Sequence, residues 1–208
     1  MLGNAIEAIL GPQLADFERI DDLRWVSAAR NEIRRVFEFE ALKGATYSAR
    51  WGFSVEFVPM LVGRKISWKK SAHKATFDLC IDPIDELGSV PHWCSFVKSS
   101  SDIQRAKIAS ESFKRAQVDL NCISSMSDLA QLFRDRSVMT FRRFSLANYV
   151  QTDLAWGLVL LACGNEEGAA GHLEKFCDEF GIASDSSIIR KAQQEARTYS
   201  TQSSPISR

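Results

Sequence analysis

The sequence has few cysteines and does not arrange them in pairs. Its 5 cysteines are odd in number, and none belongs to a C-x-x-C pair such as zinc ribbons and redox sites use. This pattern is typical of reduced thiols in a cytosolic chain rather than of a disulfide framework. Net charge is missing too, because 26 basic residues balance 26 acidic ones. The balance argues against nucleic-acid or membrane binding driven by overall charge.

Long apolar runs are also missing. The longest one, from Leu154 to Cys163, is much shorter than the roughly 20 residues that a bilayer span needs. The first residues, MLGNAIEAILG, carry no basic stretch of the kind that opens a secretory leader. We therefore expect a cytoplasmic protein with no membrane partner.

The motifs of several common enzyme classes are absent. Neither of the phosphate-cradling loops, G-x-x-x-x-G-K-[ST] and G-x-G-x-x-G, occurs, and there is no G-x-S-x-G nucleophile elbow. No spacing ties Cys94 or a serine to His92 and an acid. The sequence names no reaction, and we expect no cofactor.

The strongest positive signal is a change to a hydrophobic period of two between Gly44 and Asp82. Apolar and mostly polar residues alternate from Trp51 to Phe57 and again from Phe77 to Asp82, which predicts two half-buried strands. Ile66 and Trp68 predict a shorter strand between them. Short connections favour an antiparallel meander, because a parallel crossover needs a dozen or more residues.

Helical signals lie on both sides of this stretch. Apolar residues spaced by three and four predict an amphipathic helix over residues 23–36, with Asp21 and Asp22 at its positive end. After the strands, Ser101 is a good cap for a helix that ends before Gln117, and Ser127 caps a short helix.

The C-terminal third predicts a helical hairpin. Ser145 opens a helix that stops at Gly164, and Asn165 opens another that stops at Gly181. A last helix covers residues 186–199. The expected fold is therefore α+β, an antiparallel sheet of three or more strands packed by helices and completed by this hairpin. We expect a single domain over residues 1–198 and a flexible polar tail over residues 199–208.

A resemblance enters at the predicted strands. The strings RVFEFEALKGATYSARWGFSVEFVP and KISWKKSAHKATFDLCIDP resemble a group of uncharacterised bacterial domains, the domain-of-unknown-function 4304 group, over Ile33 to Pro83. In that group a helix leads through a glycine turn into strands of this kind. The resemblance implies a compact α+β protein of bacterial origin, with an immunity-like role beside a toxin as one expectation. It implies no catalytic residue.

Four residues are candidates for metal-assisted hydrolysis. Asp78 and Asp82 share one face of a predicted strand, with His73 and His92 nearby in the sequence. The Cα atoms of Asp78 and Asp82 would lie about 13 Å apart along an ideal strand, too far for both carboxylates to bind one ion unaided. Solvation of the polar face explains the acids more simply. Because Cys80, His92 and Cys94 also lack a fourth ligand, we assign no metal site.

A second set of residues is a candidate binding surface. Tryptophan carries a large share of interface energy, and lysines near a hairpin can contact an anion, although a basic edge that deters aggregation explains the lysines as well. With the inner face of the sheet filled by other residues, at least one indole should reach the surface. The candidate binding residues are Trp51, Trp68, Lys69, Lys70 and Lys74.

Two functions follow as expectations. The first is a non-catalytic protein-binding protein of a bacterial cytosol, immunity-like or regulatory, whose partner is another protein. The second is a metal-assisted hydrolase or nuclease that uses the acids and histidines named above. A binding protein needs an exposed, shape-matched surface, whereas a hydrolase needs acids and histidine to converge in a concave site. The oligomeric state stays open.

Overall fold

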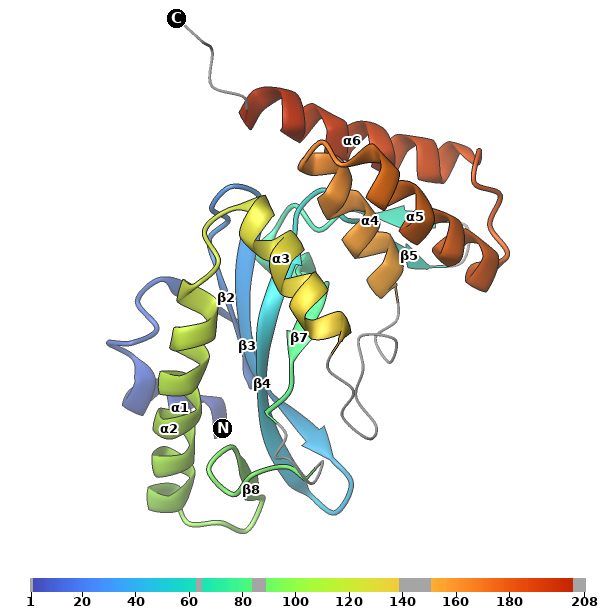
Figure 1. Cartoon of the computed structure of the whole chain (residues 1–208). Helices are drawn as coiled ribbons and strands as arrows, with labels where there is room; N and C mark the ends of the chain where they lie inside the picture. The colour runs from blue at the N-terminus through green and yellow to red at the C-terminus, as the bar shows by residue number, and fades with distance from the viewer. Residues whose placement is uncertain (1, 63–64, 84–88, 139–150, 204–208) are drawn as a thin grey trace, which may run out of the picture.

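A computed structural model describes residues 2–62, 65–83, 89–138 and 151–203 (Figure 1). Its centre is an antiparallel sheet in the order β1-β2-β3-β4-β7, with β8 also paired to β4. This confirms the predicted α+β class. The strands of the sheet are β1 (Phe17–Asp21), β2 (Arg24–Ser27), β3 (Ile33–Leu42), β4 (Thr46–Val55), β7 (Leu79–Ile81) and β8 (Ser95–Val97).

The meander prediction was wrong in its middle strand. Ile66 lies in β6 (Lys65–Ser67), which pairs with β5 (Met60–Val62) in a separate two-stranded ribbon, and Trp68 follows that strand. Strand β4 instead pairs directly with β7, with Gly52 opposite Cys80. A Cβ atom on Gly52 would lie 2.0 Å from the Leu79 carbonyl oxygen, so only glycine permits this close approach.

The predicted helix over residues 23–36 was also wrong. The segment forms β2, a tight turn and the start of β3. In the β2–β3 register, Trp25 faces Phe37 and Val26 faces Val36, so neighbouring apolar residues point to opposite sides of the sheet. Both sides are buried, and a sheet covered on both faces loses the alternation that identifies a strand. The apolar spacing of three and four in this segment therefore arose by coincidence from strands that are buried on both faces.

Helices cover one face of the sheet, and a short segment covers part of the other. Helix α2 (Asp102–Asn121) contacts β3, β4, β8 and α1 (Leu2–Leu10), which lies beside it in Figure 1. On the opposite face, Val26 and Val36 pack against Ala75, which follows the 3-10 turn η1 (Ala72–Lys74).

The helix caps follow the sequence in part. Ser101 is the cap of α2 as predicted, and its side chain accepts from Gln104 N at 3.2 Å. The helix continues to Asn121, however, past the predicted end before Gln117. Helix α3 (Met126–Ser137) is capped by Ser125 rather than by Ser127.

The C-terminal helices form the predicted hairpin and one further helix. Helix α4 (Thr152–Ala162) contacts α5 (Glu166–Phe180) and α6 (Ser187–Ser203), and the three gather at one end of the molecule (Figure 1). Asn165 caps α5 and Gly181 ends it with φ 61°, as predicted. The predicted start at Ser145 lies outside the described residues. Because α6 extends to Ser203, the first residues of the predicted tail are helical.

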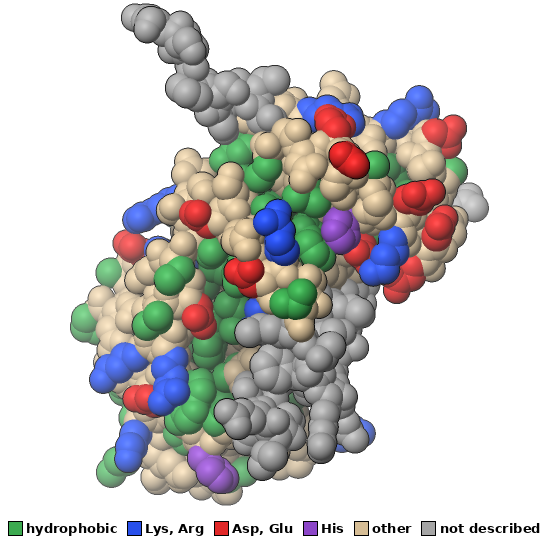
Figure 2. Space-filling model, in the orientation of Figure 1, with side chains coloured by type: hydrophobic (Ala, Val, Ile, Leu, Met, Phe, Trp, Pro, Cys, Tyr) green, Lys and Arg blue, Asp and Glu red, His purple; other side chains and the backbone are tan. Residues whose placement is uncertain are grey.

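Two further features agree with the composition. Figure 2 shows acidic and basic side chains interspersed over the visible face, without a large area of one sign. Among the described residues, no helix has the length and apolar character needed to cross a lipid bilayer.

Candidate functional site

Asp78 and Lys69 do not lie on the surface. They form a buried ion pair, and Asp78 Oδ2 also accepts from Val55 N at 2.7 Å. Burial raises the pKa of the Asp78 carboxyl and lowers the pKa of the Lys69 ammonium group, because each charged form loses water. Asp78 is therefore occupied as a structural group, and Lys69 is not part of an exposed basic edge.

The other predicted acid and histidines lie apart from one another. Asp82 is half-buried, with Cys80 Sγ 3.7 Å from its Oδ1 atom, and burial raises the pKa of its carboxyl. His73 is exposed in η1, with Nε2 3.6 Å from a Glu18 carboxylate oxygen, and His92 is exposed beside α2. In the part of the chain that the structure describes, no three acid, histidine or cysteine side chains are placed to hold a metal ion.

The predicted binding residues divide between core and surface. Trp51 is buried, and its indole Nε1 donates to Asp119 Oδ2 at 2.8 Å. Trp68 is half-buried, and the Lys70 Nζ atom lies 5.7 Å from the centre of one of its rings. Lys70 and Lys74 are exposed. Only Trp68, Lys70 and Lys74 therefore reach solvent as the prediction required.

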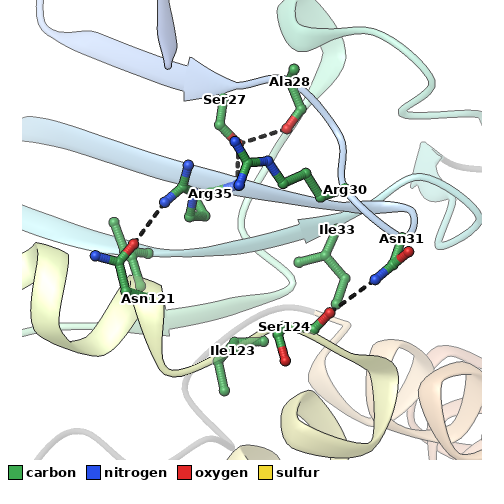
Figure 3. Close-up of a pocket in the computed structure, with 10 residues that line it drawn as sticks. Ser27, Ala28, Arg30, Asn31, Ile33, Arg35, Asn121, Ile123 and Ser124 are labelled. Carbon is green, nitrogen blue, oxygen red and sulfur yellow. Dashed lines mark hydrogen bonds between the residues drawn. The ribbon is translucent and has the colours of Figure 1, made fainter. Parts of the chain in front are cut away.

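A site that the sequence did not indicate lies at the β2–β3 turn. Arg30 and Ile33 exchange backbone hydrogen bonds of 2.9 and 3.0 Å, and the two residues between them, Asn31 and Glu32, have φ of 52° and 63°. Both positive angles match the tight hairpin turn of type I′. Glu32 occupies the second central position of this turn, where glycine is the usual residue. Asn31 Nδ2 donates to the Ser124 carbonyl at 3.0 Å, so the turn is tied to the loop after α2 (Figure 3).

Two adjoining pockets flank this turn. One, of about 290 Å³, lies between the turn and the end of α2, and the other, of about 720 Å³, extends toward β1 and η1. They share four lining residues, so they lie next to one another. We call the two pockets together the arginine groove and define it by Ser27, Arg30, Arg34, Arg35, Asn121 and Asp16.

The guanidinium groups of Arg30 and Arg35 turn toward one another in this groove (Figure 3). Both lie 3.4 Å from a single oxygen of Asp16, which is long for a charge-assisted hydrogen bond. Arg35 is fixed more firmly, because it donates to Asn121 Oδ1 at 2.8 Å and lies 5.2 Å above the Phe17 ring.

Arg34 lines the larger of the two pockets. Its guanidinium donates to the Ser27 carbonyl at 3.1 Å and pairs with Glu56. Its Nε atom is buried and finds no acceptor among the described residues. The Ser27 hydroxyl accepts from Arg35 N at 2.9 Å, so Ser27 contacts both of these neighbouring residues of β3.

This groove could not be predicted from the sequence, because the spacing of its arginines also fits the polar face of a helix. Arg30, Arg34 and Arg35 are spaced as a solvated helical face would be, and nothing nearby carries the Asn-Gly signature of a hairpin. The concentration of arginine within residues 24–35 was the one available signal.

A second cluster that the sequence reasoning missed joins α4 to α5. His172 Nδ1 lies 2.8 Å from Asp153 Oδ1, and Lys175 Nζ lies 2.6 Å from the other oxygen of that carboxylate. The His172 ring stacks on Trp156, with ring centres 3.9 Å apart. These contacts cross the helical hairpin and fasten it, so we read the cluster as structural.

No family model, no curated protein and no solved structure matches this chain. The resemblance of residues 33–83 to an uncharacterised bacterial group stays a prediction. Support for a function must therefore come from the side chains of the chain itself, and the arginine groove brings several charged side chains together in a concave setting.

Proposed function

We propose that the protein is a non-catalytic binding protein of a bacterial cytosol that recognises another protein, in an immunity-like or regulatory role. The arginine groove is the observation that supports this proposal. Arginine is enriched at the energetic centres of protein interfaces, because its planar fork can donate several hydrogen bonds while its stem packs on apolar atoms.

The groove has the rigidity that a recognition surface needs. Its hairpin turn is held by two backbone hydrogen bonds, and side chains of Asn31 and Arg35 tie it to the segment at the end of α2. A surface that is already ordered loses little conformational entropy on association. A smaller part of the interaction energy is therefore lost to ordering the surface when a partner binds.

The competing proposal of a metal-assisted hydrolase has less support. It requires Asp78 as a ligand or base, but the Asp78 carboxylate already accepts from Lys69 and from the backbone of Val55. Breaking these bonds would leave a buried ammonium group unpaired, at a cost of about 3–5 kcal/mol.

Affinity capture from the native cell tests the proposal. Tagged wild-type protein is expected to retain one partner in stoichiometric amount, and Arg30→Glu to lose it, because a reversed charge in the groove repels what the arginines attract. Arg134→Glu, at an exposed position on α3, is the matched control and should retain the partner.

Two results would overturn the proposal. One is that wild-type protein retains no partner above the level of an unrelated tagged protein. The other is a metal-dependent hydrolytic activity that disappears in Asp82→Ala while the melting temperature stays unchanged.

A further inference from the structure

We propose that the arginine groove binds a carboxylate side chain from an acidic segment of the partner protein, in the position where Asp16 now lies between Arg30 and Arg35. This inference rests on the proposed function and adds the chemistry of the partner. Asp16 acts as a weak internal occupant that an incoming carboxylate replaces.

The first argument is the number of donors that remain available. A guanidinium carries five N–H donors. Arg30 makes one long contact, of 3.4 Å to Asp16, and its side chain is 75% exposed. Arg35 uses one group on Asn121 and makes the same long contact to Asp16. Two guanidinium groups thus share one carboxylate oxygen, each at a long distance.

The second argument is the local charge. Arg34 pairs with Glu56, whereas Arg30 and Arg35 share one carboxylate, that of Asp16, within ion-pair distance among the described residues. Lys70 also lines the larger pocket but pairs with Glu195 at 3.6 Å. An incoming carboxylate would give Arg30 and Arg35 a second anion.

The third argument is the shape and lining of the smaller pocket. A volume of about 290 Å³ lies at the lower limit of ligand pockets, which span about 300–1,000 Å³, and suits a side chain rather than a folded element. Ile33, Leu120 and Ile123 contribute apolar atoms to its wall. A glutamate can place its methylene groups against these residues while its carboxylate reaches Arg30 and Arg35, which line both this pocket and the larger one where Asp16 lies.

The acids at the rim favour carboxylate over phosphate. Asp16 and Glu18 both line the larger pocket, and each repels a doubly charged phosphate more strongly than a singly charged carboxylate. The overall charge of +0 also provides no long-range attraction for a nucleic acid.

Fluorescence anisotropy with a labelled peptide of alternating glutamate and glycine tests this inference in the full chain. Wild-type protein should bind this peptide and not its glutamine counterpart. Arg30→Gln should weaken binding about three- to tenfold, as expected for a partly exposed charge contact. Arg134→Gln should bind as wild type does.

Asp16→Asn provides the sharper variant, because its effect has the opposite sign. If Asp16 competes for the arginines, its neutralisation should strengthen binding of the glutamate peptide severalfold. If Asp16 serves only to hold the arginines in position, the same change should weaken binding or leave it unaltered, and the inference fails. Thermal melts of both variants establish that they remain folded.

Competition separates the remaining possibilities. Inorganic phosphate that displaces the peptide at a lower concentration than acetate would overturn the choice of carboxylate. A partner that is captured equally by wild type, Arg30→Gln and Asp16→Asn would overturn the inference while the proposed function stands. Peptide binding with no captured partner would overturn the proposed function instead.

Discussion

Lys69 and Asp78, which the sequence places at the surface, form an ion pair in the interior. In the sequence they belong to a basic edge and an acidic strand face, both of which would normally lie in water. In the structure they neutralise one another in the interior, where both are almost completely buried. Because the two charged groups pair with one another away from solvent, neither contributes to a surface site.

Removing one partner of this pair should destabilise the fold strongly. Lys69→Met leaves the Asp78 carboxylate buried without its counter-charge, so the free energy of unfolding should fall by about 3–5 kcal/mol. The Lys69→Met/Asp78→Asn double variant should recover much of the loss, because an amide oxygen can still accept from Val55 N. Urea unfolding at neutral pH measures the free energy of unfolding of the single and the double variant. Equal stability of the single and double variants would contradict this account.

Asp128 gives a pH-dependent prediction. Its carboxylate accepts from Ser124 N at 3.0 Å, from the Ser124 hydroxyl and from Ser125 N, and these bonds hold the pKa of Asp128 below its ordinary value. A depressed pKa means that the folded state binds the proton less readily than the unfolded state. The stabilisation is therefore complete above the ordinary aspartate pKa and is lost as the pH falls through the folded-state value.

Asp128→Asn should accordingly flatten the acid limb of the stability curve, measured as the urea midpoint between pH 5 and about pH 2. At neutral pH the variant should lose about 1 kcal/mol, since the hydrogen bond that Ser125 N donates to the Asp128 side chain is weakened. Asp135→Asn on the same helix controls for the change of charge. An unaltered acid limb in Asp128→Asn would show that the cap does not carry this dependence.

At the scale of elements, the junction of β4 and β7 depends on a single glycine. A side chain on Gly52 would overlap the Leu79 carbonyl, which is backbone and cannot move without shifting the strand. Gly52→Ala should therefore destabilise the protein by about 1–3 kcal/mol and lower its melting temperature.

Gly171→Ala is the matched control for that change. Gly171 lies in α5 with open space around the position of a Cβ atom, so alanine there should stabilise the helix by about 0.5–1 kcal/mol. Calorimetric melts of the two variants should move in opposite directions. A Gly52→Ala protein as stable as wild type would mean that β7 is not held against β4 as described.

Elements whose boundaries depend on local chemistry were predictable. The caps at Ser101 and Asn165 and the left-handed stop at Gly181 need only the residue and its immediate neighbours. The β2 and β3 strands were not predictable, because Trp25 and Val26 are both buried by parts of the chain that are distant in sequence. Periodicity reports burial on one face and fails when both faces are covered.

At the scale of the whole molecule, the arginine groove is assembled from three separate segments. The β2–β3 turn supplies the arginines, the end of α2 supplies Asn121, and the chain before β1 supplies Asp16. None of these segments carries a motif of its own. Their charges acquire a binding geometry only because the sheet and α2 bring them within hydrogen-bond distance.

The α+β class, the caps at Ser101 and Asn165, the helix stop at Gly181 and the balanced net charge could be read from the residues alone, because they follow from local conformational preference and composition. Which charges are buried, which strands pair and where the arginines meet became apparent in the folded chain. Those outcomes depend on contacts between residues far apart in the chain, such as Arg35 with Asn121 and Asn31 with Ser124. Each is stabilised by desolvation and hydrogen-bond geometry that exist only once the chain has folded.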